Sequence, residues 1–157
     1  MPKKWLTDAE AREYLAARIE GRLATVDPDG QPYITPLNYI VHQDKIYFHC
    51  AVKGHKMDNI AADSRVCFEV SHTDKSVFAA KTCECSTRYT SVLVFGRARL
   101  LESVEEKVRI LSEISARFAA GRPYEPVEAA GAAGCSVVEV SIEKISGKRN
   151  IDPPGAD

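Results

Sequence analysis

The spacing of apolar residues predicts a helix near each end of the chain. Thr7 begins a capping box, and apolar residues then recur at helical spacing, which predicts a helix over residues 8–20 that is closed by Gly21. A second capping box at Ser103 opens an amphipathic pattern that runs to about Gly121. Both helices are therefore expected to bury one apolar face.

Two strands joined by a tight turn are predicted after the first helix. Residues 22–27 and 31–41 are rich in β-formers. Between them lies Pro28-Asp29-Gly30, in which the proline has a fixed φ that suits a turn and the glycine tolerates a positive φ. Pro36 lies inside the second strand and cannot donate a ladder hydrogen bond. We therefore expect a β-hairpin whose second strand lies at a sheet edge or carries a bulge.

Residues 45–50 alternate in character and predict a third strand, with His49 on the face opposite Phe48. The chain then passes through Gly54 into a short helix with two contrasting faces. The predicted apolar face holds Met57, Ile60 and Ala61, and the predicted polar face holds Lys56, Asn59 and Asp63. The helix is expected to pack by the first of these faces.

Two further strands are predicted in the middle of the chain. Residues 65–70 and 89–101 are rich in β-formers, and Gly96 within the longer strand predicts a bulge or a bend. The intervening residues 71–86 are polar and are expected to be irregular. A long strand that bends is typical of a barrel.

The C-terminal third predicts a loop, a last strand and a coil. Residues 122–135 lack periodicity and are expected to form a loop, residues 136–145 a strand, and the chain from Lys148 on an exposed coil. Six or seven strands with peripheral helices indicate an α+β fold built on a largely antiparallel barrel.

Composition and charge exclude several classes of function. The 157 residues are 45% hydrophobic, which suffices for one domain with a core. Lys and Arg number 21 against 22 Asp and Glu, and the basic residues are scattered, so nucleic acid is not an expected partner. No apolar run is long enough to cross a bilayer, and the N-terminus lacks the apolar core of a signal peptide. We therefore expect a cytoplasmic protein without a membrane partner.

The cysteines are expected to be reduced thiols because their number is odd and their spacing uneven. They are Cys50, Cys67, Cys83, Cys85 and Cys135. Cys83 and Cys85 could supply half of a metal site, but such a pair needs two further ligands at suitable spacing. We therefore expect no metal centre.

The stretch Phe48–Lys56 is the strongest candidate for binding chemistry. It passes from a strand through a glycine into the first turn of a helix, where free backbone N–H groups, the helix dipole and the Lys56 ammonium can converge on one phosphate. Outside that context Lys56 is an ordinary surface lysine and His49 an ordinary polar residue on the outer face of a strand. His55 is expected to be exposed.

Several motifs, in this order and at this spacing, resemble those of a known family. They are Gly21-Arg22-Leu23-Ala24-Thr25, Pro36-Leu37-Asn38-Tyr39, Phe48-His49-Cys50-Ala51 with Gly54-His55-Lys56, Tyr89-Thr90-Ser91-Val92 with Phe95-Gly96-Arg97-Ala98, and Ile145-Ser146-Gly147-Lys148. The family is that of the FMN-binding split barrels related to pyridoxamine 5'-phosphate oxidase, particularly its nitroimidazole-resistance-like branch. The resemblance covers about residues 7–148 and leaves 149–157 as a flexible tail. It implies a split β-barrel of six or seven strands.

The resemblance also implies FMN as the cofactor, bound between the two subunits of a homodimer. The implied contacts are Thr35, Pro36, Leu37, Asn38 and Tyr39 along the isoalloxazine ring, His49, Cys50 and Ala51 along the phosphoribityl chain, Lys56 at the phosphate, and Arg88, Ser91 and Val92 nearby. Two features depart from the family pattern. Cys50 stands where a small or hydroxyl residue is common, and the alanine- and glycine-rich residues 122–135 stand where a bulky segment often covers the pocket.

The activity that this resemblance implies is that of an FMN-dependent oxidoreductase, with a nitroaromatic or similar small electrophile as the expected substrate. His49 is the candidate catalytic residue, as a proton donor. Three alternatives stay open: a reductase that uses the deazaflavin F420, a haem-binding module with His49 or His72 as axial ligand, and a flavin-binding protein without catalysis.

Overall fold

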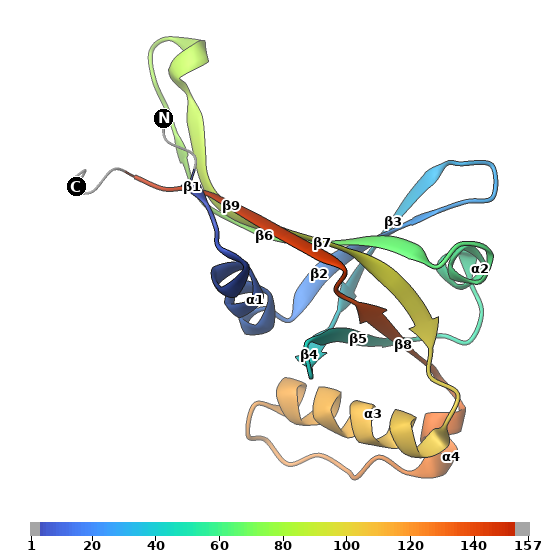
Figure 1. The fold of residues 1–157 in the computed structure, drawn as a ribbon. Coiled ribbons are helices and arrows are strands. Elements are labelled where there is room, and N and C mark those ends of the chain that lie inside the picture. Colours follow the sequence, from blue (N-terminus) through green and yellow to red (C-terminus); the bar gives the residue numbers. More distant parts are fainter. Residues whose placement is uncertain (1–3, 153–157) are drawn as a thin grey trace.

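The structure, a computed structural model, describes residues 4–152 and shows an α+β fold with a mostly antiparallel sheet that does not close (Figure 1). The strands are β1 (Lys4–Trp5), β2 (Glu20–Val26), β3 (Pro32–Asn38), β4 (Ile40–His42), β5 (Lys45–Cys50), β6 (Arg65–Val77), β7 (Ser86–Leu100), β8 (Ser136–Ser141) and β9 (Lys144–Asn150). The helices are α1 (Asp8–Ala17), α2 (His55–Ala62), α3 (Val104–Ala119) and α4 (Ala129–Ala133), with a 3-10 turn over Thr82–Glu84. The predicted fold class, an α+β split barrel, is confirmed.

The described residues contain nine strands where six or seven were expected. Two predicted strands are each divided in the structure: residues 31–41 form β3 and β4, and residues 136–145 form β8 and the start of β9. The two-residue β1 was not predicted. The first division lies at Tyr39, whose N–H donates to the carbonyl of Ile19, so the chain leaves β2 there. Within residues 4–152 no helix is long and apolar enough to span a membrane.

The strands follow the order β3-β2-β6-β7-β8-β5-β4, and β9 pairs with β7 and β1. On the edge opposite β6, β7 pairs with β9 as far as Phe95 and with β8 from Ala98 on. Gly96 lies at this change of partner, and a Cβ there would come within 1.7 Å of the carbonyl oxygen of Ser141. Only glycine permits that approach of the two backbones.

The first helix ends earlier than predicted, because α1 stops at Ala17 and Arg18 is already extended. The capping box at its start is confirmed, with the side chains of Thr7 and Glu10 each accepting a backbone N–H. Gly21 does not close the helix. It lies in β2, where a Cβ would come within 2.4 Å of the Phe68 ring, so the glycine is needed for packing.

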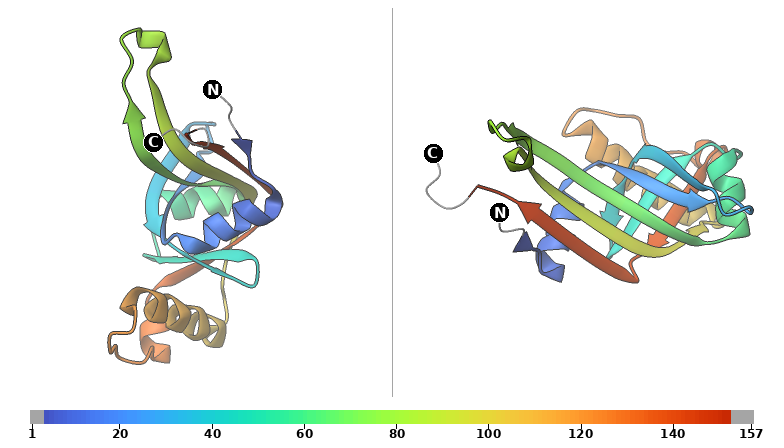
Figure 2. Two further views of the ribbon diagram at one scale, coloured as in Figure 1. Left: turned by 90° about the vertical axis from the view of Figure 1, so that its left-hand side faces the viewer. Right: turned by 90° about the horizontal axis from the view of Figure 1, so that it is seen from above.

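The prediction of an irregular segment at residues 71–86 is wrong for most of its length. β6 continues to Val77 and β7 begins at Ser86, so the two strands form a ribbon that extends away from the barrel (Figures 1 and 2). On β6, six of the seven residues 71–77 are exposed, so this half lacks the alternation of apolar and polar residues that identifies a half-buried strand. On β7, by contrast, Arg88 and Thr90 are buried.

The predicted exposed coil after Lys148 is also wrong as far as Asn150. β9 includes these residues and pairs with both β7 and β1, and Asn150 is buried. Asp152 then accepts hydrogen bonds from Arg88 and forms an ion pair with Lys75 at 2.6 Å. The rest of the predicted tail, residues 153–157, lies outside the described residues.

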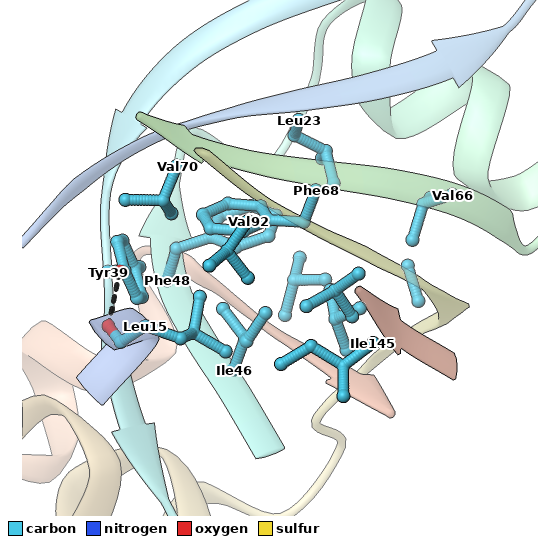
Figure 3. Close-up of a cluster of buried hydrophobic side chains, with 14 of the residues drawn as sticks. Leu15, Leu23, Tyr39, Ile46, Phe48, Val66, Phe68, Val70, Val92 and Ile145 are labelled. Carbon is cyan, nitrogen blue, oxygen red and sulfur yellow. Dashed lines mark hydrogen bonds between the residues drawn. The ribbon is translucent and has the colours of Figure 1, made fainter. Parts of the chain in front are cut away.

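Two clusters of buried side chains lie on opposite faces of β5. The larger fills the inside of the barrel, where Phe48 and Phe68 are fully buried among aliphatic residues (Figure 3). The smaller lies between α3 and the outer face of β5 and includes Tyr47, Ile110 and Val137. Residues 122–135 are not entirely a loop as predicted, because the short α4 packs against α3.

Candidate functional site

The sheet is open between β3 and β5, and the two motif segments of the sequence lie on either side of this opening. β3 continues through Tyr39 into β4, which pairs with β5, but within residues 4–152 no ladder joins β3 to β5. Ile40 is opposite Tyr47, so the same register continued by two residues sets Asn38 across the opening from His49. From that junction β3 and β5 diverge, and α2 lies at the wide end (Figure 1).

The free edge of β3 offers several acceptors and few donors. The N–H of Asp27 donates to the carbonyl of Gln31, so the alternation of an antiparallel ladder directs the backbone groups of the even-numbered residues of β3 away from β2. Two of these four residues are Pro32 and Pro36, which have no N–H. The edge therefore presents four carbonyls but N–H groups only at Ile34 and Asn38. Pro36 lies on an edge strand, as predicted.

The side chains of β3 divide between the two faces of the sheet. Pro36 and Asn38 are exposed on the outer face, and Thr35 and Leu37 are partly buried on the inner face. The hydroxyl of Thr35 is buried and has no hydrogen-bond partner in the described part of the chain. Tyr39 lies elsewhere, because its ring is fully buried and its hydroxyl donates to the carbonyl of Leu15 at 2.5 Å. Tyr39 is thus a core residue.

The end of β5 supplies one exposed histidine and one partly buried thiol. His49 is exposed on the face opposite the fully buried Phe48, as the alternation predicted. Cys50 is half-buried, and its Sγ lies 3.4 Å from Sδ of Met57 on α2. Burial raises the pKa of the Cys50 thiol, although the charge of Lys56 opposes this. Cys50 therefore helps to pack α2 against β5 as a neutral thiol.

The first turn of α2 is uncapped. Gly54 precedes the helix with φ of 140°, a conformation that favours glycine, and has no side chain to accept a hydrogen bond from the helix. The carbonyl of Gly54 accepts from Met57 and Asp58, so the amides of His55 and Lys56 precede the first helical hydrogen bond. Lys56 is partly buried beside them.

A hydrogen-bonded network connects α2 to the end of β2, and sequence reasoning missed it. Nε2 of His55 lies 2.7 Å from Oδ1 of Asp27, and Nδ2 of Asn59 donates to the same oxygen at 2.6 Å. Asn59 is buried and Ala61 exposed, so the faces assigned to these two residues were wrong. Asp27 stands at the start of a turn, where aspartate is common without any other role. No local pattern could therefore have indicated the network.

Three predicted contacts lie on β7, away from the opening between β3 and β5. β2 and β6 separate β7 from β3, a span of three strand spacings or roughly 14 Å. Val92 is fully buried in the core, Ser91 is partly buried on the outer face of the sheet, and Arg88 is buried with Nε donating to Asp152. One chain thus gathers Thr35–Asn38, His49–Ala51 and Lys56 around the opening, but not these three.

Among residues 4–152, no three histidine, cysteine or acidic side chains lie close enough to hold a metal ion. Cys83 and Cys85 are exposed near the tip of the ribbon.

The family model described as pyridoxamine 5'-phosphate oxidase matches residues 7–149. The chain belongs to this family. No curated protein matches it.

Several solved structures share the fold of this member of the pyridoxamine 5'-phosphate oxidase family. An FAD- and haem-binding protein from Mycobacterium smegmatis is 23% identical, with a TM-score of 0.85 over 98% of this chain and 77% of that one. A candidate 5-nitroimidazole antibiotic resistance protein from Bacteroides thetaiotaomicron is 21% identical, with a TM-score of 0.79 over 95% of this chain and 89% of that one. An FAD-binding protein from Mesorhizobium loti is 25% identical, with a TM-score of 0.72 over 96% of this chain and 100% of that one.

Proposed function

We propose that the protein is an FMN-dependent oxidoreductase that binds its flavin between two subunits and reduces a nitroaromatic or similar small electrophile. The observation that carries the proposal is the uncapped, cationic start of α2 beside the open edge of β3. Membership of the pyridoxamine 5'-phosphate oxidase family supports it, as do similar structures described as FAD-binding or as a candidate nitroimidazole resistance protein.

The residues around the opening fit a flavin mononucleotide in their chemistry. The pyrimidine edge of an isoalloxazine carries both N–H and carbonyl groups, and the free edge of β3 offers the carbonyl of Pro36 and the N–H of Asn38. The buried hydroxyl of Thr35 has no other partner in the described residues. At α2, the free amides of His55 and Lys56 and the Lys56 ammonium suit a phosphate. Ala51, exposed between these two regions, leaves room for the connecting chain.

A bound flavin would supply the two-electron chemistry, and the protein would supply orientation, polarity and a proton. His49 is exposed beside the opening, and its imidazole could deliver a proton from a ring nitrogen to a reduced substrate. The N–H of Asn38 would stabilise negative charge that develops at the pyrimidine edge.

A second copy of the chain would complete the site from the outer face of the sheet. An apolar row crosses this face: Ile34 on β3, Ala24 on β2, Cys67 on β6 and Phe95 on β7. The side chains at its two ends are the most accessible, with Ile34 62% and Phe95 44% exposed. Such a row offers an apolar surface that a second copy could cover. Pro36 and Asn38 point to the same face, so a partner on it would stand next to the free edge of β3.

The proposal is tested first by the colour and mass of the purified protein. We expect a yellow protein with two broad visible bands, and native mass spectrometry should show a dimer that retains FMN. Titration of the flavin-free protein with FMN, FAD and F420 should give the tightest binding for FMN. The flavin-reduced protein should then be reoxidised by a nitroaromatic acceptor without oxygen. A protein that binds none of these cofactors, or one with the single intense band of haem, would contradict the proposal.

A further inference from the structure

The carboxylate of Asp27 is held in place from inside the molecule. Both hydrogens of the Asn59 amide are used, one toward Oγ1 of Thr25 at 3.1 Å and one toward Oδ1 of Asp27 at 2.6 Å. Asn59 and Thr25 are each only 1% exposed, and the Asp27 side chain is 19% exposed. The Asp27 carboxylate is therefore a fixed acceptor at the end of β2, directed toward the start of α2.

That acceptor fixes the ring of His55. Oδ1 of Asp27 lies 2.7 Å from Nε2 of His55, and the ring also stacks against Tyr33 with centroids 4.2 Å apart and planes 32° apart. Two contacts on different strands thus define the ring position. In the described residues Nδ1 makes no hydrogen bond, and the side chain is 49% exposed. Nδ1 is the nitrogen left for a ligand.

A fixed acceptor on one nitrogen determines what the other can do. When the imidazole is neutral, its one hydrogen lies on Nε2 and is donated to Asp27, so Nδ1 carries a lone pair that repels a phosphate oxygen. When the ring is protonated, Nδ1–H becomes a donor on the first residue of α2. Asp27 thereby restricts donation from His55 to its protonated form.

We propose that Asp27 is a positioning residue that makes the affinity of the α2 phosphate site depend on pH through His55. The inference rests on the proposed function, since it concerns the same site. The chain should hold a phosphorylated flavin more tightly at neutral than at alkaline pH, whereas a site built on lysine and amides alone would not change over that range.

The charged and titratable groups around the ring come from each element near it. They are Asp27 directly after β2, Tyr33 on β3, Lys53 in the preceding loop, and Lys56 and Asp58 on α2. Only Asp27 and Tyr33 are in contact with the ring in the described residues.

The test compares the dissociation constants of FMN and riboflavin between pH 6.5 and pH 8.5, where a phosphomonoester is mostly a dianion and an imidazole ordinarily loses its proton. Loss of one charge-assisted hydrogen bond should weaken FMN binding roughly fivefold over this range. Riboflavin, which has no phosphate, should show no such change. In His55→Lys the cation persists, and in Asp27→Asn the neutral ring can take either tautomer, so both variants should lose the pH dependence.

The outcomes separate this inference from the proposed function. Equal pH dependence of FMN affinity in the parent, His55→Lys and Asp27→Asn would overturn the role of Asp27 and leave the flavin site intact. A parent that binds neither flavin would overturn both proposals. Because Asp27→Asn alters a buried contact, its riboflavin affinity and unfolding temperature show whether its fold is retained, and His55→Lys tests the inference without touching that contact.

Discussion

At the scale of single residues, Glu139 on β8 is a buried carboxylate with several hydrogen-bond partners. The Glu139 carboxylate accepts hydrogen bonds from Lys45 at 3.0 Å, from the Tyr47 hydroxyl at 2.7 Å and from Arg99 at 2.7 and 2.9 Å. Burial favours its neutral form, but these donors outweigh burial and lower the pKa of Glu139 to about 2. Burial first, and Glu139 second, raise the pKa of Tyr47 to about 12.

The pH dependence of stability follows from the lowered pKa of Glu139. Its contribution to the free energy of unfolding is complete above pH 4.5, the ordinary pKa, and is lost as the pH falls toward 2. We expect Glu139→Gln to lower that free energy by about 2 kcal/mol at pH 7, because charge-assisted hydrogen bonds are weakened. Urea unfolding of the parent and the variant at pH 7 and pH 3 measures this difference in the free energy of unfolding. The parent and the variant should differ less at pH 3, and an unchanged difference would exclude this role.

The exposed position of His49 allows its function to be tested without disturbing the fold. We expect His49→Ala to lower turnover of a nitroaromatic substrate roughly 100-fold, the effect of losing a general acid. Flavin content, measured by absorbance, should stay close to that of the parent since the side chain is exposed. Unchanged turnover would reject His49 as the proton donor.

At the scale of elements, the position of α2 decides the chemistry, since this helix brings its first turn to the wide end of the β3–β5 opening. Contacts from β5 and from β2 with the residue after it hold the helix: Cys50 packs on Met57, and Asn59 donates to Thr25 and Asp27. The helix is two turns long and would not be stable alone. Its orientation is therefore a product of tertiary packing.

The phosphate role of α2 predicts a difference between two neighbouring lysines. We expect Lys56→Ala to weaken FMN binding roughly tenfold and to leave riboflavin binding unchanged, because one charge-assisted contact to phosphate is lost. Lys53→Ala, which removes an exposed cation from the preceding loop, is the matched control and should have little effect. Fluorescence titration of both flavins measures this. Equal effects of the two substitutions would indicate only a general attraction between charges.

Local chemistry determined which elements could be predicted from the sequence. The hairpin at residues 22–41, the start of α1 and the exposure of His49 each follow from a turn, a cap or an alternation within a few residues. The pairing of Asp27 with His55 depends on residues 28 positions apart that meet only when α2 docks. The β6 half of the ribbon was missed because six of the seven residues 71–77 are exposed.

At the scale of the whole molecule, the outer face of the sheet and α3 lie on different sides of the barrel (Figures 1 and 2). The helix covers β5 and β8, whereas the apolar row with Ile34 and Phe95 has no cover in the described chain. Ser91 lies on the same outer face, so the proposed association would bring it toward a second copy, whereas Arg88 is buried and donates to Asp152.

Charge introduced on the outer face should disrupt this association. We expect Phe95→Glu to convert the proposed dimer to a monomer at micromolar concentration and to weaken its binding of flavin, because an unpaired charge in an interface is costly. Tyr124→Ser alters an aromatic side chain that is 49% exposed in the loop after α3 and should leave the dimer intact. Native mass spectrometry reports both. A Phe95→Glu dimer that keeps its flavin would refute an interface on this face.

The prolines of β3 have a consequence for solubility. An unpaired sheet margin can recruit strands from other molecules and seed fibrils, and β3 is such a margin over seven residues. Pro32 and Pro36 remove half of the amides that an incoming strand would need, while the carbonyls stay accessible to a small molecule. Pro32 and Pro36 thus leave the edge of β3 accessible to a small molecule while they hinder the addition of strands from other molecules.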